Sequence, residues 1–522
     1  MAPIKHANDA VHWFLSELGA RVVAETGIPS DRHHFGKLIL RSLKDAPNFV
    51  MQIDGATGES ETYKSVLERT VRCAVSLKKL GLKNGDNITL MAPNHLHLTI
   101  PYYAALYLGI GIAPLDAFLT VVELEAMFKI NEAKVVFCQN ERVPFVKEAL
   151  KNVKLDATIV TFNDSDECIT FYNFLEKYGA DADVEQFRAT DLDPVETIAM
   201  LVSTSGTTGM PKAASLTHKN FMLSLPFVWI GSSHFPTPTR LALVSSPLQW
   251  LSAGFHFMLS PILRYTRLQT SAPFTSEHFV ELVNKYRPTA TTVSPPLITT
   301  LTRPENVAKC DISCFEFICI GGSAVPQELL ERIHVKVNIG YFHLGKLKLV
   351  NSETKEDIDE PHVKGELWLR GPSICKGYYN CPEVTKESFE DGGWFRSGDI
   401  FYRDENYNFY FVERLKLLLK YRNHQISPLE LETVIRQNPG VLDVAVIGIP
   451  DNEAGELPVA CIVLKSGYKV TAQEIKDLVK NSLTETKQLR GGVIFMKELP
   501  MTASTKVHRQ RLKEMVTNME KE

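Results

Sequence analysis

Apolar residues recur with two different periods over the first part of the chain. From Tyr63 to Leu80, and in an amphipathic run from Ala10 to Val23, they return at the spacing of one helical face. Short apolar runs at residues 87–91 and 134–138 have instead the length of buried strands. Because helical patterns alternate with such runs, the sequence predicts a parallel sheet flanked by helices.

The same alternation starts again after Thr217. A helix is expected there, then a strand at residues 240–247 and a long apolar helix from Gly254 to Tyr265. Two further strands are expected at residues 290–294 and 315–320. A second sheet of the same kind is therefore predicted.

Past residue 360 the pattern changes to short strands separated by Gly, Tyr and Pro, as at residues 365–371. This pattern of short strands and turn residues predicts a small β-rich subdomain. Charged residues at 403–406 and 413–416 indicate a boundary to a further α+β domain. The predicted fold class is thus α/β. A large N-terminal domain, residues 1–412, holds two α/β sheets and the β-rich subdomain, and a smaller domain covers residues 413–522.

Composition narrows the class of protein. A chain of 522 residues needs two or more domains, and 44% apolar with 23% charged residues is ordinary for a globular protein. The net charge of −4 argues against a nucleic-acid partner. Nine cysteines at irregular spacing predict reduced thiols and no zinc site. The adjacent histidines His33 and His34 are expected at the surface.

Targeting signals give an expected location. No secretory signal and no apolar run near the ~20 residues of a membrane span is visible, so no integral membrane segment is expected. A cytoplasmic protein is predicted. A peroxisomal one is the alternative, although the chain does not end in Ser-Lys-Leu.

One glycine- and hydroxyl-rich loop carries the strongest chemical signal. It follows the apolar run 197–202, so its backbone N–H groups and hydroxyls are free to donate to phosphate oxygens, and its lysine adds a point charge. It is not the usual P-loop, because Ala213 follows the lysine where Ser or Thr would hold magnesium. The predicted nucleotide-phosphate residues are Ser203, Thr204, Ser205, Gly206, Thr207, Thr208, Gly209 and Lys212.

This loop resembles the phosphate loop of the adenylate-forming superfamily, and the similarity runs over nearly the whole chain. Within that superfamily the chain is most similar to the insect luciferase-like fatty acyl-CoA synthetases. The resemblance implies that a carboxylate attacks the α-phosphate of ATP to give acyl-AMP, and that CoA then displaces AMP. It also implies ATP, Mg²⁺ and CoA as cofactors, a small-molecule carboxylic acid as substrate, and a C-terminal domain that moves as a lid. The family glycine after Lys212 is Ala213 here.

The resemblance also assigns roles to single residues. Asp399, in Gly393–Asp399, matches the ribose-binding carboxylate, and Arg414 would complement ribose or phosphate charge. Lys506 matches the lysine that stabilises charge in adenylation. Lys420 matches the lysine that enters the site for thioester formation. Glu413 stands at the family's hinge aspartate.

The acid and the adenylate are expected beside residues of two further segments. Trp250, Phe255, Phe257 and Met258 suggest an apolar wall for a fatty or other hydrophobic acid, although core packing explains the same residues. The predicted acid-pocket residues are Gln249, Trp250, Gly254, Phe255, Ser323 and Ala324, and the turn Gly321–Gly322 is expected beside the acyl-adenylate.

The largest departure from the family follows Tyr341. Gly340 and Tyr341 match the adenine-binding strand, but the Thr and Glu that should follow are missing. A tight turn at Gly345 would then join two strands, and contacts to magnesium and phosphate would be lost. No metal-ligating residue is therefore predicted. The favoured activity is an AMP-forming acid–thiol ligase, and a catalytically impaired binding protein is the alternative. Luciferase-type oxygenation is disfavoured, because Gln249 and Trp250 replace the pocket histidine.

Overall fold

The computed structural model divides the chain into two compact units. Met1–Gly345 with Gly371–Glu387 forms the first, and Lys346–Arg370 with Ser388–Glu522 forms the second. The structure describes residues 2–204, 212–225, 240–294, 297–298, 301, 306, 308–321, 346–421, 424–451, 454–483, 485–502, 506–517 and 519.

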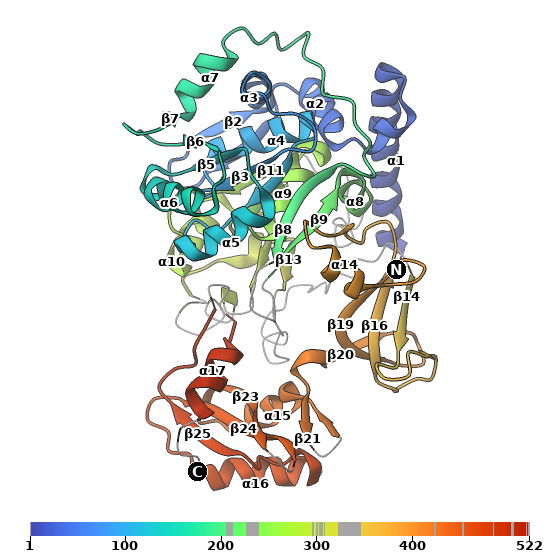
Figure 1. Cartoon of the computed structure of the whole chain (residues 1–522), viewed down its shortest axis with the longest axis vertical. Coiled ribbons are helices and arrows are strands. Elements are labelled where there is room, and N and C mark those ends of the chain that lie inside the picture. The colour runs from blue at the N-terminus through green and yellow to red at the C-terminus, as the bar shows by residue number, and fades with distance from the viewer. Residues whose placement is uncertain are drawn as a thin grey trace. The chain divides into compact units, whose positions relative to one another are not determined.

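The first unit contains the predicted parallel sheet (Figure 1). Its inner strands are parallel, and the last two strands at one edge run antiparallel to their neighbours. In spatial order the strands are β17 (Gly377–Tyr378), β9 (Lys212–Thr217), β8 (Ile198–Thr204), β4 (Gly111–Pro114), β3 (Asn87–Met91), β5 (Val135–Cys138), β6 (Thr158–Thr161) and β7 (Ile169–Thr170).

The second predicted sheet is present in the same unit, and its strands are parallel except at one edge. In spatial order they are β13 (Phe317–Ile320), β12 (Ala290–Val293), β10 (Leu241–Val244), β11 (Thr266–Gln269), β1 (Val50–Asp54) and β2 (Ser60–Thr62). The expected strands at 240–247, 290–294 and 315–320 are confirmed with shorter bounds, because only residues 241–244, 290–293 and 317–320 pair with a neighbouring strand.

Helices separate and cover these sheets. They are α1 (Ala2–Thr26), α2 (Phe35–Asp45), α3 (Tyr63–Lys79), α4 (Thr99–Leu108), α5 (Val121–Asn131), α6 (Val143–Val153), α7 (Phe171–Gly179), α8 (His218–Ser224), α9 (Leu251–Leu263), α10 (Ser276–Tyr286) and α14 (Pro382–Ser388).

Helices α4 and α9 share one hydrophobic core with both sheets. Phe257 of α9 is fully buried, and its carbonyl accepts the hydroxyl of Tyr103 at 2.5 Å. Met200 of the first sheet and Ala242 of the second belong to the same cluster. An apolar helix that packs against two sheets has little exposed surface, which explains why most residues of α9 are apolar and buried.

The prediction that His34 lies at the surface is wrong. Its side chain is fully buried before α2, where Nδ1 accepts the backbone N–H of Lys37 at 3.2 Å. Nε2 lies 2.9 Å from the carbonyl oxygen of Thr190. Burial lowers the pKa of His34 to about 4, so the ring is neutral at neutral pH. The pair of histidines gave no sign of this role, because a histidine is an uncommon N-cap.

The second unit carries two antiparallel-rich sheets. The first is the predicted β-rich subdomain, with strands β15 (Asp357–Ile358), β14 (Lys346–Val350), β16 (Gly365–Arg370), β19 (Trp394–Arg403), β18 (Phe389–Glu390) and β20 (Phe409–Arg414). The expected strand at 347–350 is thus present as β14. The proposed partner strand and the turn at Gly345 lie outside the described residues.

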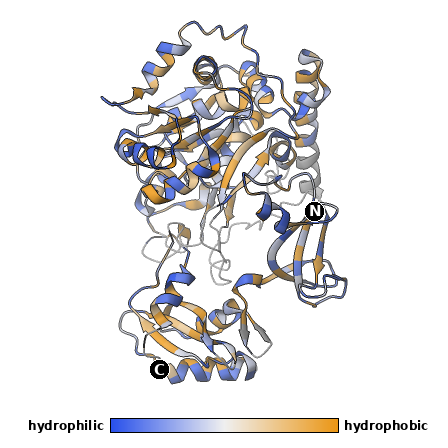
Figure 2. Cartoon of the chain, viewed as in Figure 1, coloured by the Kyte–Doolittle hydropathy of each residue, from blue (hydrophilic) through white to orange (hydrophobic). Residues whose placement is uncertain are grey.

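The second sheet belongs to the α+β part at the C-terminus. Helices α15 (Pro428–Ile435) and α16 (Ala472–Ser482) share one apolar cluster on it, and α17 (Arg509–Thr517) packs into another. Figure 2 shows hydrophobic colouring concentrated on its strands and mixed colouring on the helices. In spatial order the strands are β22 (His424–Ile426), β21 (Leu419–Tyr421), β24 (Gly455–Leu464) and β23 (Val441–Asp451), and β25 (Gly492–Met496) pairs with β24.

The second unit groups the β-rich subdomain with the C-terminal residues. The sequence instead predicts a division at residue 413, with residues 413–522 moving as one domain. That division remains a prediction. All nine cysteines lie in the described part and are free thiols. None of the described helices is both long and apolar enough to cross a bilayer.

Close packing of α2 on α4 generates a stability prediction. A Cβ added at Gly36 would lie 2.2 Å from the carbonyl oxygen of Leu106, a backbone atom that cannot rotate away. We expect Gly36→Ala to lower the free energy of unfolding by about 1–3 kcal/mol, measured by urea denaturation. Gly19→Ala is the control, because its Cβ would come no nearer than 3.3 Å to any atom, the nearest being the Cβ of Arg32. Equal stability of the two variants would contradict the packing argument.

Candidate active site

The phosphate-loop prediction falls on the end of a β-hairpin. Strands β8 and β9 run antiparallel, with Ser203 opposite Ala213 and Thr204 opposite Lys212. The structure therefore brings Ser203, Thr204 and Lys212 together. Ser205, Gly206, Thr207, Thr208 and Gly209 lie outside the described residues.

Two features of this hairpin bear on phosphate binding. The hydroxyl oxygen of Ser203 is buried and has no hydrogen-bond partner among the described residues, so it is available to a ligand. The ammonium of Lys212 lies 5.8 Å from the ring centre of Tyr378, on the neighbouring β17. Ala213 is a buried strand residue, so the family glycine's conformational freedom is not needed there.

The predicted acid pocket lies around the start of α9. Gln249 is half-buried, and Trp250 is 40% exposed. Gly254 is buried, and a Cβ there would lie 3.0 Å from the terminal methyl carbon of Met200. Phe255 is half-buried and packs edge-on against Phe221, with ring centres 5.9 Å apart.

Part of the expected apolar wall belongs to the core instead. Phe257 and Met258 are fully buried and pack into the central cluster, so core packing explains them. Gly321 directly follows β13. Gly322, Ser323 and Ala324 lie outside the described residues.

Sequence reasoning missed His256, on the half-buried side of α9 with Ser252 and Phe255. Its Nδ1 lies 3.0 Å from the hydroxyl of Tyr265, while no partner of Nε2 is found among the described residues. Burial, with the charges of Arg240 and Arg267 nearby, lowers the pKa of His256 to about 4, so the ring is neutral. The available signal was the four-residue spacing from Ser252, which places both polar residues on one helical face.

Asp399 and Arg414 lie directly opposite each other on β19 and β20. Arg414 Nε is 2.8 Å from Asp399 Oδ1. Burial raises the pKa of Asp399; Arg414 opposes this rise, and the nearby carboxylates of Glu413 and Glu366 add to it. A carboxylate whose charge depends on one arginine can accept two ribose hydroxyls while staying ionised.

Glu413, at the expected hinge position, is 4% exposed. One carboxylate oxygen accepts the backbone N–H of Leu429 at 3.0 Å and the hydroxyl of Ser427 at 3.3 Å. The other oxygen accepts the N–H of Arg414 at 2.9 Å. Glu413 therefore joins the end of β20 to the first turn of α15, where a negative charge is stabilised.

The two predicted catalytic lysines both belong to the second unit. Lys420 lies in β21, and its side chain is outside the described part. Lys506 is exposed; its N–H donates to the hydroxyl of Thr502 at 3.2 Å, and its carbonyl accepts the N–H of Thr502 at 2.7 Å. Gly340 and Tyr341, the predicted adenine residues, lie outside the described residues.

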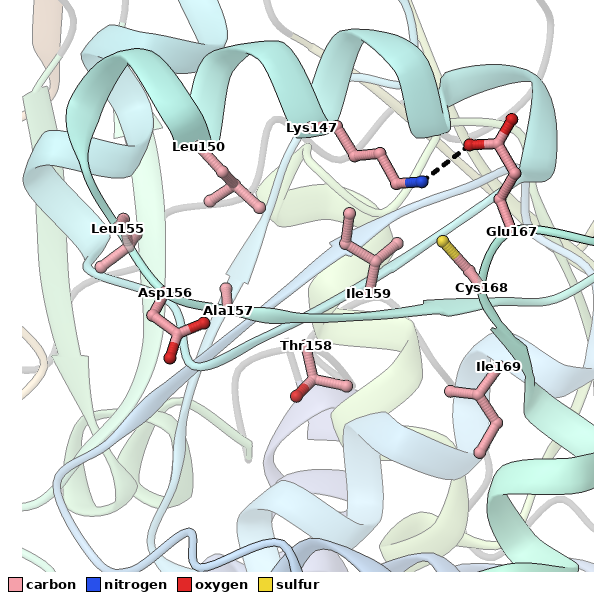
Figure 3. Close-up of a pocket in the computed structure, with 10 residues that line it drawn as sticks. All are labelled: Lys147, Leu150, Leu155, Asp156, Ala157, Thr158, Ile159, Glu167, Cys168 and Ile169. Atoms are coloured by element: carbon pink, nitrogen blue, oxygen red, sulfur yellow. Dashed lines mark hydrogen bonds and ion pairs between the residues drawn. The ribbon is translucent and has the colours of Figure 1, made fainter.

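A separate pocket contains none of the predicted site residues (Figure 3). It lies between α6 and strands β6 and β7, and the ion pair of Lys147 with Glu167, at 2.7 Å, crosses one side. Within the described residues, no group of three His, Cys, Asp or Glu side chains has the arrangement of a metal site.

The chain belongs to the AMP-binding enzyme family. The family model matches residues 40–345, and the model of the AMP-binding enzyme C-terminal domain matches residues 430–506.

Individual relatives span nearly the whole chain. Luciferin 4-monooxygenase of Nipponoluciola cruciata is 31% identical over 507 residues, covering 89% of this chain and 90% of that protein. 4-Coumarate–CoA ligase 4 of Arabidopsis thaliana is 27% identical over 516 residues, covering 90% and 88%. The fold matches ATP-bound MatB from Rhodopseudomonas palustris, with a TM-score of 0.82 at 21% identity, over 93% of this chain and 99% of that one.

The Asp399–Arg414 pair generates a pH prediction. Because the folded state raises the pKa of Asp399, the stability associated with this group is greatest below its usual pKa and is lost as pH rises through the folded value. Arg414 limits that loss by pairing with the ionised form. We expect Arg414→Met to destabilise the protein more at pH 7 than at pH 4, measured by urea unfolding at both values.

Asp399→Asn supplies the control for this prediction. In that background Arg414→Met should have the same effect at both pH values, because no carboxylate remains at position 399 to titrate. A pH difference that persists without Asp399 would assign the effect to another group.

Proposed function

We propose that this protein is an AMP-forming ligase that activates a hydrophobic carboxylic acid as acyl-AMP and transfers the acyl group to CoA. The observation that carries the proposal is the register of the β8–β9 hairpin, which places Lys212 opposite Thr204. The preceding residue, Ser203, has a hydroxyl without a hydrogen-bond partner among the described residues. Hydroxyl and ammonium groups at the end of a strand suit phosphate oxygens.

In this proposal ATP supplies the adenylyl group, and the chain binds and orients it. Ser203, Thr204 and Lys212, with residues 205–209, hold the phosphates, and Asp399 accepts the ribose hydroxyls. Arg414 keeps Asp399 ionised. Gly321, Gly322, Gly340 and Tyr341 line the adenylate. Mg²⁺ is expected to accompany ATP, bound chiefly through its phosphates.

The two lysines serve the two half-reactions. Lys506 stabilises negative charge while the acid attacks the α-phosphate, and Lys420 acts when CoA displaces AMP. This division needs residues 413–522 to move between the steps. The acid is placed beside Trp250 and Phe255, whose aromatic surfaces favour an apolar chain.

A catalytically impaired binding protein on the same scaffold is the second candidate. It is favoured by the sequence after Tyr341, where the family's Thr and Glu are missing. Lost donors at a centre of developing charge cost roughly 10²–10³ in rate each. Luciferase-type oxygenation ranks third, because Gln249 and Trp250 stand where the pocket histidine is expected.

ATP–pyrophosphate exchange with a long-chain fatty acid separates the first two candidates. We expect exchange by the wild type, and a loss of about 10²–10³-fold in Lys506→Met, which lacks the charge that stabilises the transition state. Lys212→Met should also lose exchange. Lys480→Met, at an exposed position in the last turn of α16, is the matched control and should keep full activity. ATP binding without exchange would favour the binding protein.

His256 generates a prediction about acid choice. Its neutral ring can donate or accept one hydrogen bond beside the proposed acid pocket. We expect His256→Leu to lower kcat/KM for hydroxylated acids by about tenfold relative to the unsubstituted acids of the same length. The two acid series are compared in the same exchange assay. An equal effect on both series would show that His256 does not contact the acid.

A further inference from the structure

An edge strand of the C-terminal sheet has its outward peptide groups bound by side chains. Among the described strands, β23 pairs with β24 alone. The unpaired side of such a strand has N–H and C=O groups that need other hydrogen-bond partners. At Val446, side chains bind both the N–H and the C=O group.

Three hydrogen bonds close a ring around Val446. Its N–H donates to Glu432 Oε1 at 2.8 Å, and its carbonyl accepts Arg509 Nη1 at 2.6 Å. Arg509 Nη2 donates to the same Glu432 oxygen at 2.7 Å. The planar guanidinium suits this ring, because its two N–H donors point in fixed directions. The Glu432 side chain is 4% exposed, so water competes little for its carboxylate.

The ring connects two helices that pack into different apolar clusters. Glu432 lies on α15, whose Leu431 and Ile435 are buried in the cluster that includes α16. Arg509 is the first residue of α17, whose Leu512 and Val516 are buried in the other cluster. The start of α17 is therefore fixed to β23 and to α15 together.

Lys506 precedes Arg509 by three residues, and the intervening backbone is tied down. Val507 pairs antiparallel with Met501. His508 N–H donates to the carbonyl of Pro500 at 2.7 Å, and its Nδ1 accepts the N–H of Arg511 at 3.2 Å. The orientation fixed at Arg509 is thus passed to the backbone of Lys506, while the lysine side chain stays exposed.

We propose that the Glu432–Arg509 pair is the positioning element for Lys506 in acyl-adenylate formation. The inference rests on the proposed function. A flexible lysine side chain stabilises charge only if its backbone leaves the domain in the right direction, and a displacement of about 1 Å can cost roughly 10²-fold in rate. Arg509 and Glu432 act through Lys506 and do not touch the substrate themselves.

The test uses Arg509→Lys in the full chain. Lysine keeps the positive charge, so Glu432 is not left buried beside an uncharged residue, but it cannot make both hydrogen bonds at once. We expect kcat for ATP–pyrophosphate exchange to fall by roughly 10–10²-fold with KM for ATP nearly unchanged. Thioester formation from supplied acyl-AMP, which does not use Lys506, should change by less than about twofold.

Two comparisons separate positioning from general stabilisation. Lys513→Met removes another ion pair of α17, that of Lys513 with Glu456 at 2.9 Å, and should leave exchange unchanged. In a Lys506→Met background, Arg509→Lys should cause no further loss, because the residue being positioned is already gone.

The inference would be overturned if Arg509→Lys slowed adenylation and thioester formation by the same factor. It would also be overturned if Lys513→Met slowed exchange as much as Arg509→Lys does. A third contrary result would be that Arg509→Lys lowers the exchange rate in the Lys506→Met background by the same factor as in the wild type. Failure of the proposed function can be distinguished from failure of the positioning role. If the proposed function is wrong, the wild type shows no exchange or Lys506→Met leaves exchange unaffected, and the inference is then wrong as well. If Lys506→Met abolishes exchange and Arg509→Lys does not alter it, only the positioning role fails.

Discussion

The antiparallel pairing of β9 with β8 is the constraint on which the phosphate-binding proposal depends. In an otherwise parallel sheet, β8 alone would deliver Ser203 and Thr204 to the edge and send the chain away through a helix. Because β9 returns beside it, Lys212 comes back opposite Thr204, one strand spacing away. Because residues directly opposite each other share a face, the side chains of Thr204 and Lys212 lie on the same face of the hairpin. The ring centre of Tyr378, on the neighbouring strand β17, is 5.8 Å from the lysine ammonium.

A second constraint comes from placing an apolar helix between two sheets. Polar groups on α9 or the adjacent strands must then find partners inside the core. Arg267 of β11 does so only in part and without a carboxylate: its Nη2 donates to Gln52 at 2.8 Å and to Thr99 at 2.9 Å. Its guanidinium carbon lies 4.0 Å from the ring centre of Phe257, while Nε and Nη1 have no hydrogen-bond partner among the described residues. Its charge is one reason why His256 stays neutral. The interior of this unit thus holds a buried positive charge close enough to His256 to lower its pKa.

The two-sheet fold could be predicted because parallel, fully buried strands are continuous apolar runs that differ in period from helices. The strand at 87–91 and the helix starting at Tyr63 match the observed elements for that reason. Pattern reasoning failed where a tertiary contact decides the outcome. His34 is a polar residue that is buried because the N–H of Lys37 and the carbonyl of Thr190 meet its ring. Phe257 is equally apolar whether it lines a pocket or fills a core, so only packing distinguishes the two. The cross-strand position of Asp399 and Arg414 depends on register across a long hairpin, which local sequence leaves open.

Two buried carboxylates make α15 the link between the proposed ribose residue and the proposed catalytic lysine. Glu413, next to Arg414, caps the start of α15 through Leu429, and Glu432 near its end holds β23 and α17. The first contact is a cap on a helix terminus, and such a cap typically contributes about 1 kcal/mol. The second is a buried, charge-assisted ring, whose loss would leave a carboxylate without its partner. Both contacts lie within residues 413–522, so both would move with that domain if it rotates between half-reactions. The ring then travels with Lys506, so the lysine keeps its orientation within the lid while the lid changes its position.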